Sequence, residues 1–417
     1  MKTIVINEKD ATRVPFLRGI LIRSLLDAGL EFEQALELAT TMREQLSDVA
    51  EVSSDEIRQK VSALLEENGH LGAMEPYRLP LGAAVRILVE GPDGSVAFSR
   101  AEHERYLQGS GLKAEKAEQI TNLVYEQLLA SGAASIPSSN LAYLTYLCLQ
   151  QEISRKAARR YLIWSEYLRS GRPLLLMICG TVGSGKSTIA TDVAHLLDIV
   201  RIQSTDMLRE VMRMMMPEKL LPVLHTSSFN AWKALPIQDV KDRDKDQVLE
   251  DGFRSQSDLL SVSIEAVLNR AVEESVPMII EGVHVHPSVS AHPSEKSDAI
   301  TVSATLAVLK AKVLKARLRG RGAEVPQRLA ARYVKCFDAI WSLQSFLLSE
   351  SDMYDVPIIT NDDRDKTVRQ IIQQVNYELS RHFTGKPRDV YGPIVDQVAE
   401  ESSSEDWYEL VPMLVTE

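Results

Sequence analysis

One short segment constrains the fold more than any other part of the chain. An uninterrupted apolar run, 174–179, leads into Gly180–Thr188, which has the sequence GTVGSGKST, and an apolar stripe with helical spacing follows. An apolar run of this kind is typical of a strand that is buried on both faces of a parallel sheet. The pattern G-x-x-x-x-G-K-S between a strand and a helix predicts a phosphate-binding loop in an α/β domain.

The residue types in this loop suit a nucleoside triphosphate and Mg²⁺. Its glycines let the backbone turn so that successive N–H groups and a helix N-terminus face the phosphates. We expect Lys186 to reach the β- and γ-phosphates and Ser187 to offer its hydroxyl to Mg²⁺. The predicted ATP-binding residues are Gly180, Thr181, Val182, Gly183, Ser184, Gly185, Lys186, Ser187 and Thr188, with Asn361 after the last predicted strand, 356–361.

Acidic residues lie at the ends of two further predicted strands. The strand 199–203 leads to Asp206, and the strand 277–283 contains Glu281. Ligands bind at the carboxyl ends of the strands in open α/β sheets. We therefore expect Asp206 to position or deprotonate an acceptor hydroxyl and Glu281 to orient Mg²⁺ together with Ser187. The alternative for Asp206 is a helix cap.

Arginines follow these acids where they could bind phosphates. On the predicted helix 207–216, Arg209 and Arg213 lie one and two turns beyond Asp206, which suits a negatively charged acceptor. The segment RLRGRG follows the predicted fourth strand, and we expect it to form a lid in which Arg319 and Arg321 close over the phosphates and exclude water. The alternative is that these arginines lie on solvated helix surfaces.

The composition excludes several classes of protein. The 417 residues are 45% hydrophobic and 25% charged, which is ordinary for a globular protein of more than one domain. No apolar stretch approaches the ~20 residues that span a bilayer, and the N-terminus lacks a secretory pattern, so we expect a cytoplasmic protein without a membrane partner. Three distant cysteines argue against a disulfide framework or a cysteine-rich zinc site.

The net charge of −11 is concentrated near the C-terminus. Residues 389–417 include eight Asp or Glu and no Lys or Arg, so the rest of the chain is nearly balanced. We therefore expect no nucleic-acid partner, since nucleic acid requires a basic face. We expect the EESSSED segment of this tail, 400–406, to be a solvated, mobile terminus. Docking through Trp407 and Tyr408 is the alternative.

The first half of the chain contains an internal repeat. A shift of 82 residues aligns 3–46 with 85–128 without a gap. Each copy begins with alternating β-branched and polar residues and continues with amphipathic helical patterns, so we expect two small α+β modules in tandem. The predicted second helices are 32–46 and 114–131, and the predicted third helices are 54–67 and 141–167.

The first copy resembles the ATP-cone, a nucleotide-binding regulatory module. The resemblance spans about residues 2–70 and rests on a strand, a charged turn, VPFLRGILIRSLLDAGL and SSDEIRQKVSALL. It implies that a regulatory nucleotide is held by Lys9, Arg13 and Arg18. Gly91 and Ser95 replace the first two residues in the second copy, so we expect that copy to have lost its phosphate contacts. A purely structural role for both modules is the alternative.

The second half resembles the archaeal 2-phosphoglycerate kinases and their plant relatives. The segments that carry the resemblance are STDMLREVMR, LLPVLHTSSFNAW, GFRSQSDLLSVSIEAVL, MIIEGVHVHP and RYVKCFDAIWSLQSFL. The order of parts, with a cone-like module before the kinase, also agrees. The resemblance implies transfer of the ATP γ-phosphoryl group to the hydroxyl of 2-phosphoglycerate. The residues expected to bind the acceptor are Arg209, Arg213, His225, Ser227, Ser228 and His284.

Two departures from the family leave alternatives open. The late helix has IWSLQ at 340–344, where an arginine is typical of the family, and the second cone-like copy is additional. Other phosphorylated acceptors, such as an inositol phosphate, therefore remain open. So does a nucleotide-sensing regulatory protein with a non-catalytic kinase fold, whereas a polynucleotide 5′-kinase is disfavoured because no basic groove is predicted.

Taken together, the sequence predicts an α/β P-loop kinase with a parallel five-stranded sheet, preceded by two cone-like modules. The expected limits are 1–80 and 83–168 for the modules, 172–385 for the kinase domain and 389–417 for the acidic tail. The predicted catalytic residues are Lys186, Asp206, Arg319 and Arg321. ATP, Mg²⁺ and a small phosphorylated substrate are the expected ligands, and a homo-oligomer is left open.

Overall fold

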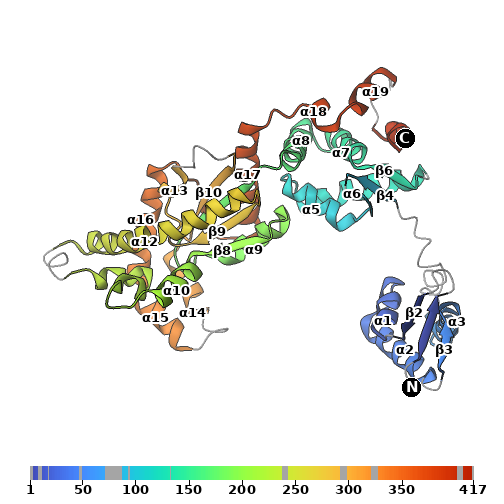
Figure 1. The fold of residues 1–417 in the computed structure, drawn as a ribbon, viewed down its shortest axis with the longest axis horizontal. Helices are drawn as coiled ribbons and strands as arrows, with labels where there is room; N and C mark the ends of the chain where they lie inside the picture. Colours follow the sequence, from blue (N-terminus) through green and yellow to red (C-terminus); the bar gives the residue numbers. More distant parts are fainter. Residues whose placement is uncertain are drawn as a thin grey trace. The chain divides into compact units, whose positions relative to one another are not determined.

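The computed structural model divides into two compact units, Met1–Leu88 with Val96–Phe98, and Val89–Ser95 with Ser99–Glu417 (Figure 1). The described residues are 3–7, 12–16, 18–46, 49–70, 87–92, 94–131, 133–236, 243–291, 298–320, 327–401 and 407–415. None of the helices in these ranges combines the length and the apolar character needed to cross a membrane.

The first module is a three-stranded sheet with three helices. Strand β1 lies in the centre of the order β2-β1-β3, antiparallel to β2 and parallel to β3. Ser53 and Glu56 form a reciprocal capping box that starts the third helix. The elements are β1 Ile4–Asn7, β2 Thr12–Pro15, α1 Arg18–Asp27, α2 Phe32–Gln45, β3 Glu51–Ser53 and α3 Ser54–Glu67.

The second module repeats this arrangement. Its elements follow the same order along the chain, and its sheet has the equivalent strand order β5-β4-β6. The elements are β4 Leu88–Gly91, β5 Gly94–Ala97, α5 Arg100–Gly109, α6 Ala114–Ala130, β6 Ser135–Pro137 and α7 Ser138–Glu152. The internal sequence repeat therefore corresponds to a repeated supersecondary unit.

One helix expected in the second module is in fact two. The segment 141–167 was predicted as a single helix, but α7 ends at Glu152 and α8 occupies Arg155–Ser170. The side chain of Ser154 accepts a hydrogen bond from the backbone N–H of Ala157 at 3.2 Å and caps the second helix. The prediction was wrong because a continuous apolar stripe masks a serine that starts a new helix.

The kinase domain contains the predicted parallel sheet of five strands, in the order β11-β10-β7-β9-β8. Central strand β7, Leu174–Cys179, is buried along its whole length, as the apolar run requires. The other strands are β8 Arg201–Ser204, β9 Met278–Gly282, β10 Ile300–Ala307 and β11 Ile358–Thr360. The helices are α9 Lys186–Leu197, α10 Thr205–Met215, α12 Lys245–Glu273, α13 Ser288–Ala291, α14 Ala311–Gly320, α15 Gln327–Lys335, α16 Phe337–Met353 and α17 Arg364–His382, with 3-10 helices η1 Pro222–His225 and η2 Ser228–Ala234.

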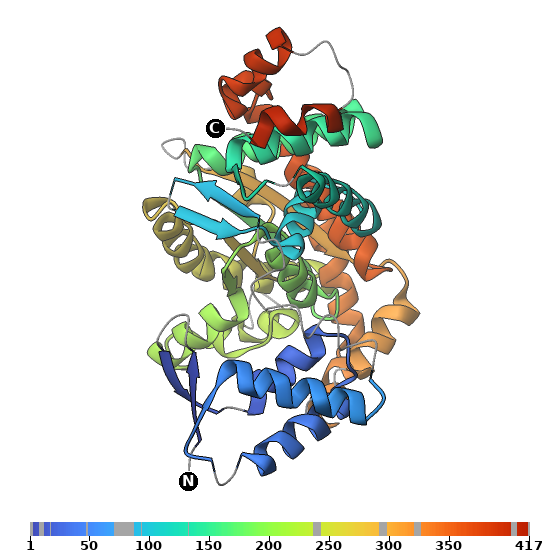
Figure 2. The same ribbon diagram turned by 90° about the vertical axis from the view of Figure 1, so that its right-hand side faces the viewer.

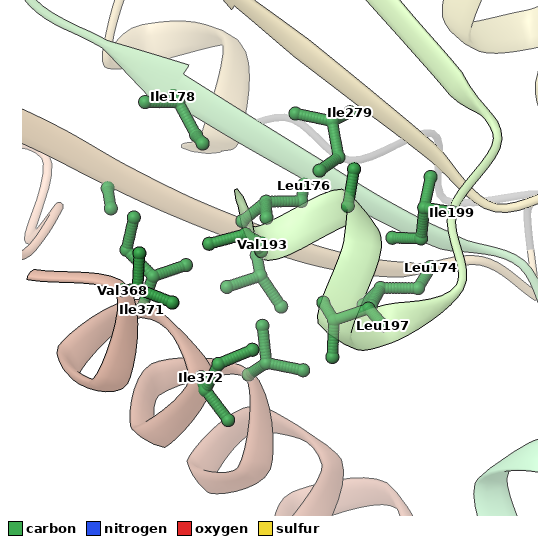
Figure 3. Packing of buried hydrophobic residues seen from close by; sticks show 14 of the residues in the cluster. Leu174, Leu176, Ile178, Val193, Leu197, Ile199, Ile279, Val368, Ile371 and Ile372 are labelled. Atoms are coloured by element: carbon green, nitrogen blue, oxygen red, sulfur yellow. The ribbon is translucent and has the colours of Figure 1, made fainter. Parts of the chain in front are cut away.

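Helices cover both faces of this sheet. Figure 3 shows one face, where Val193 and Leu197 of α9 and Ile372 of α17 pack with Leu174 and Leu176 of β7. On the other face, α12 and α16 contribute to a second buried apolar cluster. Each fully buried aliphatic side chain stabilises the fold by about 1.5–3 kcal/mol, so these layers hold the carboxyl ends of the strands in fixed positions.

The acidic C-terminal segment is folded in part, which the sequence did not predict. It forms α18 Pro387–Tyr391, α19 Ile394–Glu401, η3 Trp407–Leu410 and α20 Val411–Val415. The last helix lies along α7 (Figure 2). Trp407 is 2% exposed, and its indole N–H donates to Oε1 of Glu152 at 3.2 Å. The predicted mobile stretch, 400–406, lies mostly outside the described residues, and the docking of Trp407 agrees with the alternative. Eight apolar side chains of the C-terminal segment are buried despite its charge; they are Val390, Tyr391, Ile394, Val398, Trp407, Leu410, Val411 and Leu414.

Candidate active site

The phosphate-binding loop has the backbone geometry that its glycines predict. Gly183 and Gly185 have φ values of 86° and 89°, a region that favours glycine, and a Cβ at Gly185 would collide with Nδ2 of Asn361. Lys186 is the first residue of α9, and its Nζ donates to the carbonyl oxygen of Thr181 at 3.0 Å. The loop therefore joins β7 to the N-terminus of a helix, which is a suitable environment for phosphates.

A cavity of about 340 Å³ lies against this loop. Its lining includes Lys186, Ser187 and two arginines that sequence reasoning did not select as site residues, Arg317 and Arg364. Arg317 lies two residues before the predicted lid residue Arg319, on another side of α14, and its Nη2 donates to the carbonyl oxygen of Asn361 at 2.6 Å. The cavity thus combines a helix N-terminus with three cationic side chains, which is an environment for a polyphosphate.

The two predicted Mg²⁺ ligands lie next to each other. The hydroxyl of Ser187 donates to Oε1 of Glu281 at 2.9 Å. Glu281 is 5% exposed and belongs to β9, which pairs with β7. The pair presents oxygen ligands beside the phosphate-binding loop, and Mg²⁺ in phosphate sites is commonly held by one or two protein oxygens and the phosphates. These two residues therefore fit a Mg²⁺ ion.

A second cavity, of about 230 Å³, adjoins the first one and shares Lys186 and Ser187 with it. Four cationic side chains, Lys186 and three arginines, face three carboxylates in its wall. The remaining residues of the wall come mainly from α10, from the segment 225–229, from the end of β9 and from α15. The predicted site residues among them are Val182, Asp206, Arg209, Arg213, His225, Ser227, Ser228 and Glu281.

Asp206 does not cap its helix. The side chain of Ser204 accepts a hydrogen bond from the backbone N–H of Asp206 and acts as the cap of α10. The Asp206 carboxylate is 69% exposed and lies 3.8 Å from Nη2 of Arg209. The alternative of a capping role is therefore wrong, and the carboxylate is accessible from the second cavity.

The arginines of the second cavity are held in different ways. Arg209 is largely buried and donates from Nη1 to the carbonyl oxygen of Thr226, which ties α10 to the segment 225–228. Arg213 pairs with Glu210 at 2.7 Å and is more exposed. Arg332 of α15, which sequence reasoning missed, donates from Nη2 to Oγ of Ser227 at 3.3 Å. Its role depends on how α15 folds back over the site, which no local pattern reveals.

His284 lies behind the second cavity rather than in its wall. It is 1% exposed, its Nε2 is 2.9 Å from Oε1 of Gln256, and its Nδ1 is 3.3 Å from Oγ1 of Thr205. Burial lowers the pKa of His284 to about 3, so the imidazole is neutral in the folded protein. The structure therefore does not bring His284 to the acceptor side, where it was predicted; it supports the first turn of α10 instead.

The structure places two further predicted residues differently: Asn361 lines the phosphate-loop cavity, whereas Arg319 does not. Asn361 is buried, and its Nδ2 donates to the carbonyl oxygen of Ser184 at 2.7 Å, so its amide holds the phosphate-binding loop. Arg319 is exposed in the last turn of α14 and lines neither cavity. Arg321 lies outside the described residues. The lid therefore remains a prediction, and Arg317 is the arginine of that segment which the structure brings to the phosphate-loop cavity.

The fold and the site define a class of protein. A parallel sheet covered by helices on both faces, with a phosphate-binding loop after its central strand, is a P-loop kinase fold. No family model matches the chain. Curated relatives do match it.

The chain is 32% identical over 306 residues to a 2-phosphoglycerate kinase of Pyrococcus horikoshii, which covers 73% of this chain and 98% of the relative. A 2-phosphoglycerate kinase of Methanopyrus kandleri is 33% identical over 295 residues, with coverage of 70% and 88%. One of Thermococcus kodakarensis is 35% identical over 282 residues, with coverage of 68% and 93%. The chain belongs to the 2-phosphoglycerate kinase family.

Proposed function

We propose that this protein transfers the γ-phosphoryl group of ATP to the free hydroxyl of 2-phosphoglycerate, which gives 2,3-bisphosphoglycerate and ADP. Membership of the family supports the reaction and the acceptor. The observation that carries the proposal is that the phosphate-loop cavity and the second cavity share Lys186 and Ser187. An acceptor in the second cavity would therefore lie next to the γ-phosphate of an ATP in the first.

On the ATP side, the loop amides and Lys186 would bind the β- and γ-phosphates, and Arg317 would add charge at the same cavity. Ser187 and Glu281 would hold Mg²⁺, which when bound neutralises negative charge on the phosphates. Phosphoryl transfer is accelerated chiefly by positioning and by electrostatic stabilisation of the transferring group. The cations around the loop therefore supply the larger part of catalysis.

On the acceptor side, Asp206 would orient the hydroxyl and accept its proton. The hydroxyl oxygen forms a bond to the γ-phosphorus while the bond from that phosphorus to the bridging oxygen of ADP breaks. Arg209, Arg213 and Arg332 would bind the carboxylate and the phosphate that 2-phosphoglycerate already carries, since guanidinium groups pair well with both. His225, Ser227 and Ser228 would contribute polar contacts in the same wall.

Some finer parts of the sequence prediction belong to the same proposal. Arg319 and Arg321 would act in a lid together with Arg317. The first module would bind a regulatory nucleotide through Lys9, Arg13 and Arg18. Arg18 is exposed at the start of α1 and donates to Oγ1 of Thr40 at 3.4 Å, Arg13 belongs to β2, and Lys9 lies outside the described residues. The proposal also includes the predicted domain limits, a cytoplasmic location and assembly into a homo-oligomer.

The test is a panel of acceptors in a coupled assay of ADP release, with Mg·ATP and the full chain. The panel contains 2-phosphoglycerate, 3-phosphoglycerate, glycerol phosphates and inositol phosphates. We expect acceptor-dependent ADP release with 2-phosphoglycerate and far less with the others. Preference for another acceptor would overturn the assigned substrate, and ADP release that is independent of every acceptor would overturn the kinase.

A further inference from the structure

A third cavity, of about 940 Å³, lies between the second module and the kinase domain. Its walls come from the turn between α5 and α6, from α8, from α9 and from α17. The volume is at the upper end of the range for sites that bind small molecules and cofactors. This cavity takes no part in the function proposed above.

The elements around this cavity are fixed to one another. The Nδ2 group of Asn376 on α17 donates to the carbonyl oxygen of Gly109, the last residue of α5, at 3.0 Å. A Cβ at Gly109 would lie 3.1 Å from the carbonyl oxygen of Leu196 on α9, so only glycine permits this close approach without a shift. The cavity is therefore formed before any ligand arrives.

The lining has an excess of positive charge. Five basic side chains face two carboxylates, and one of the carboxylates, Asp192, already pairs with Arg364 through two contacts of 2.6 Å. Among the described residues, Lys113, Arg160 and Arg369 make no ion pair. The Nε group of Arg160 is buried and has no hydrogen-bond partner among the described residues. Burial also lowers the pKa of this guanidinium.

The start of a long helix adds to this positive field. Lys113 occupies the N-cap position of α6, a helix of 17 residues, and its side chain makes no capping hydrogen bond. Helix N-termini favour anions through their unpaired N–H groups and the helix dipole. An anion in the cavity would therefore meet Lys113, Lys116 and the end of α6 on one side.

We propose that this cavity binds an organic phosphate of nucleotide size, at a regulatory site separate from the phosphate-binding loop. Arg160, Lys113 and Arg369 would bind the phosphates. Apolar side chains of the wall, among them Leu112, Ile153 and Val368, would pack against the rest of the ligand. A site of this composition binds both parts of a nucleotide, whereas a bare anion would use only the cations.

The site is coupled to the phosphate loop through Arg364, which lines both the third cavity and the phosphate-loop cavity. Its partner Asp192 belongs to α9, the helix that begins with Lys186. A bound organic phosphate attracts Arg364 toward the third cavity and removes a cation from the ATP side. The ligand therefore raises the KM for ATP, within the roughly 5–150-fold that allosteric coupling usually spans. This step rests on the proposed function.

The binding test uses the full chain with Lys186→Ala, which weakens binding at the phosphate loop. Isothermal titration with ATP, ADP and inorganic tripolyphosphate is compared between this background and the same chain carrying Arg160→Gln and Arg369→Gln. The matched control, Arg159→Gln with Lys366→Gln, removes two charges from the same two helices outside the cavity. Hydrogen exchange at 113–117 and 364–373 locates the ligand.

We expect the cavity variant to bind nucleotide about tenfold or more weakly, since it loses hydrogen bonds from charged groups to the phosphates. Its ligand-induced protection in both segments is lost, while the control behaves as the background. Equal nucleotide binding in all three proteins would overturn the site. Tripolyphosphate binding as tightly as ATP would overturn the assignment to a nucleotide-sized ligand.

The kinetic test uses chains with intact Lys186. Adding AMP, which lacks a transferable phosphoryl group, should raise the KM for ATP in the wild type and in the control, and leave it unchanged in the Arg160→Gln, Arg369→Gln variant. An equal effect of AMP in all three proteins would overturn the coupling. Turnover without any cavity binding overturns this inference alone, and cavity binding without turnover overturns the proposed function alone.

Discussion

The phosphate-loop cavity and the acceptor cavity share Lys186 and Ser187, yet they are assembled in different ways. The first depends mainly on one continuous segment, Gly180–Thr188, between a buried strand and a helix. The second gathers side chains from α10, the segment 225–229, β9 and α15. A site built from one segment tolerates changes elsewhere in the fold, whereas a site built from four elements depends on how they pack.

The largest effect should come from Lys186→Ala, since this side chain serves both cavities. We expect kcat to fall by about 10²–10³-fold or more, because a preorganised charge is lost from the transferring phosphoryl group. Single-turnover measurements with saturating ATP and acceptor would measure this loss in the rate of phosphoryl transfer. An unchanged melting temperature establishes that the fold is intact, and a loss below tenfold would contradict the role of this lysine.

Asp206→Asn should have the next largest effect and should act on the acceptor side alone. We expect kcat to fall by about 100-fold or more, as for the loss of a general base, while ATP affinity stays within twofold. The exposed Asp362→Asn, which lines neither cavity, is the matched control. A large loss of ATP affinity in Asp206→Asn would contradict the assignment of ATP to the first cavity and of the acceptor to the second.

Arginine substitutions should separate acceptor binding from catalysis. Arg332→Gln should raise the KM for 2-phosphoglycerate by about tenfold through loss of a charged hydrogen bond, with a smaller change in kcat. Arg319→Gln, in the proposed lid at the exposed end of α14, should instead lower kcat and leave the KM for 2-phosphoglycerate nearly unchanged. Steady-state kinetics with each substrate varied separates the two roles, and a larger change of this KM in Arg319→Gln than in Arg332→Gln would contradict the assignment of Arg332 to the acceptor.

The smallest effect concerns stability and its dependence on pH. The pKa of His284 is about 3 in the folded protein, whereas the ordinary pKa of a histidine is 6.5. As pH falls, the unfolded chain therefore binds a proton at this imidazole before the folded protein does. The contribution of His284 to the free energy of unfolding is therefore fully present above pH 6.5 and declines below it, by about 2 kcal/mol at pH 5. Denaturant titrations should show a shallower decline in His284→Gln than in the exposed control His195→Gln. Parallel declines would contradict a neutral buried imidazole.

The same contrast explains how much could be predicted from the sequence. The five strands, their parallel arrangement and the Ser187–Glu281 pair followed from local patterns, because the carboxyl ends of neighbouring parallel strands meet at one edge. Arg317 and Arg332 were missed because only tertiary packing turns them toward the cavities. His284 was misplaced for the same reason.

The second module and the C-terminal segment show a similar limit. The repeat itself was visible from spacing, but the break at Ser154 was hidden by a continuous apolar stripe. The docking of Trp407 depends on Glu152 and on the α7 surface, which lie more than 250 residues away along the chain. Composition described the charge of that segment correctly but gave no information on its partner.

The most direct test of the central claim is a phosphorus NMR time course with the full chain, Mg·ATP and 2-phosphoglycerate, run beside Lys186→Ala. The account predicts that resonances of 2,3-bisphosphoglycerate and ADP grow together in equal amounts as those of ATP and 2-phosphoglycerate decline, and that the variant shows almost none. ADP appearing with inorganic phosphate and no bisphosphorylated product, or ATP that stays bound and unchanged, would contradict it.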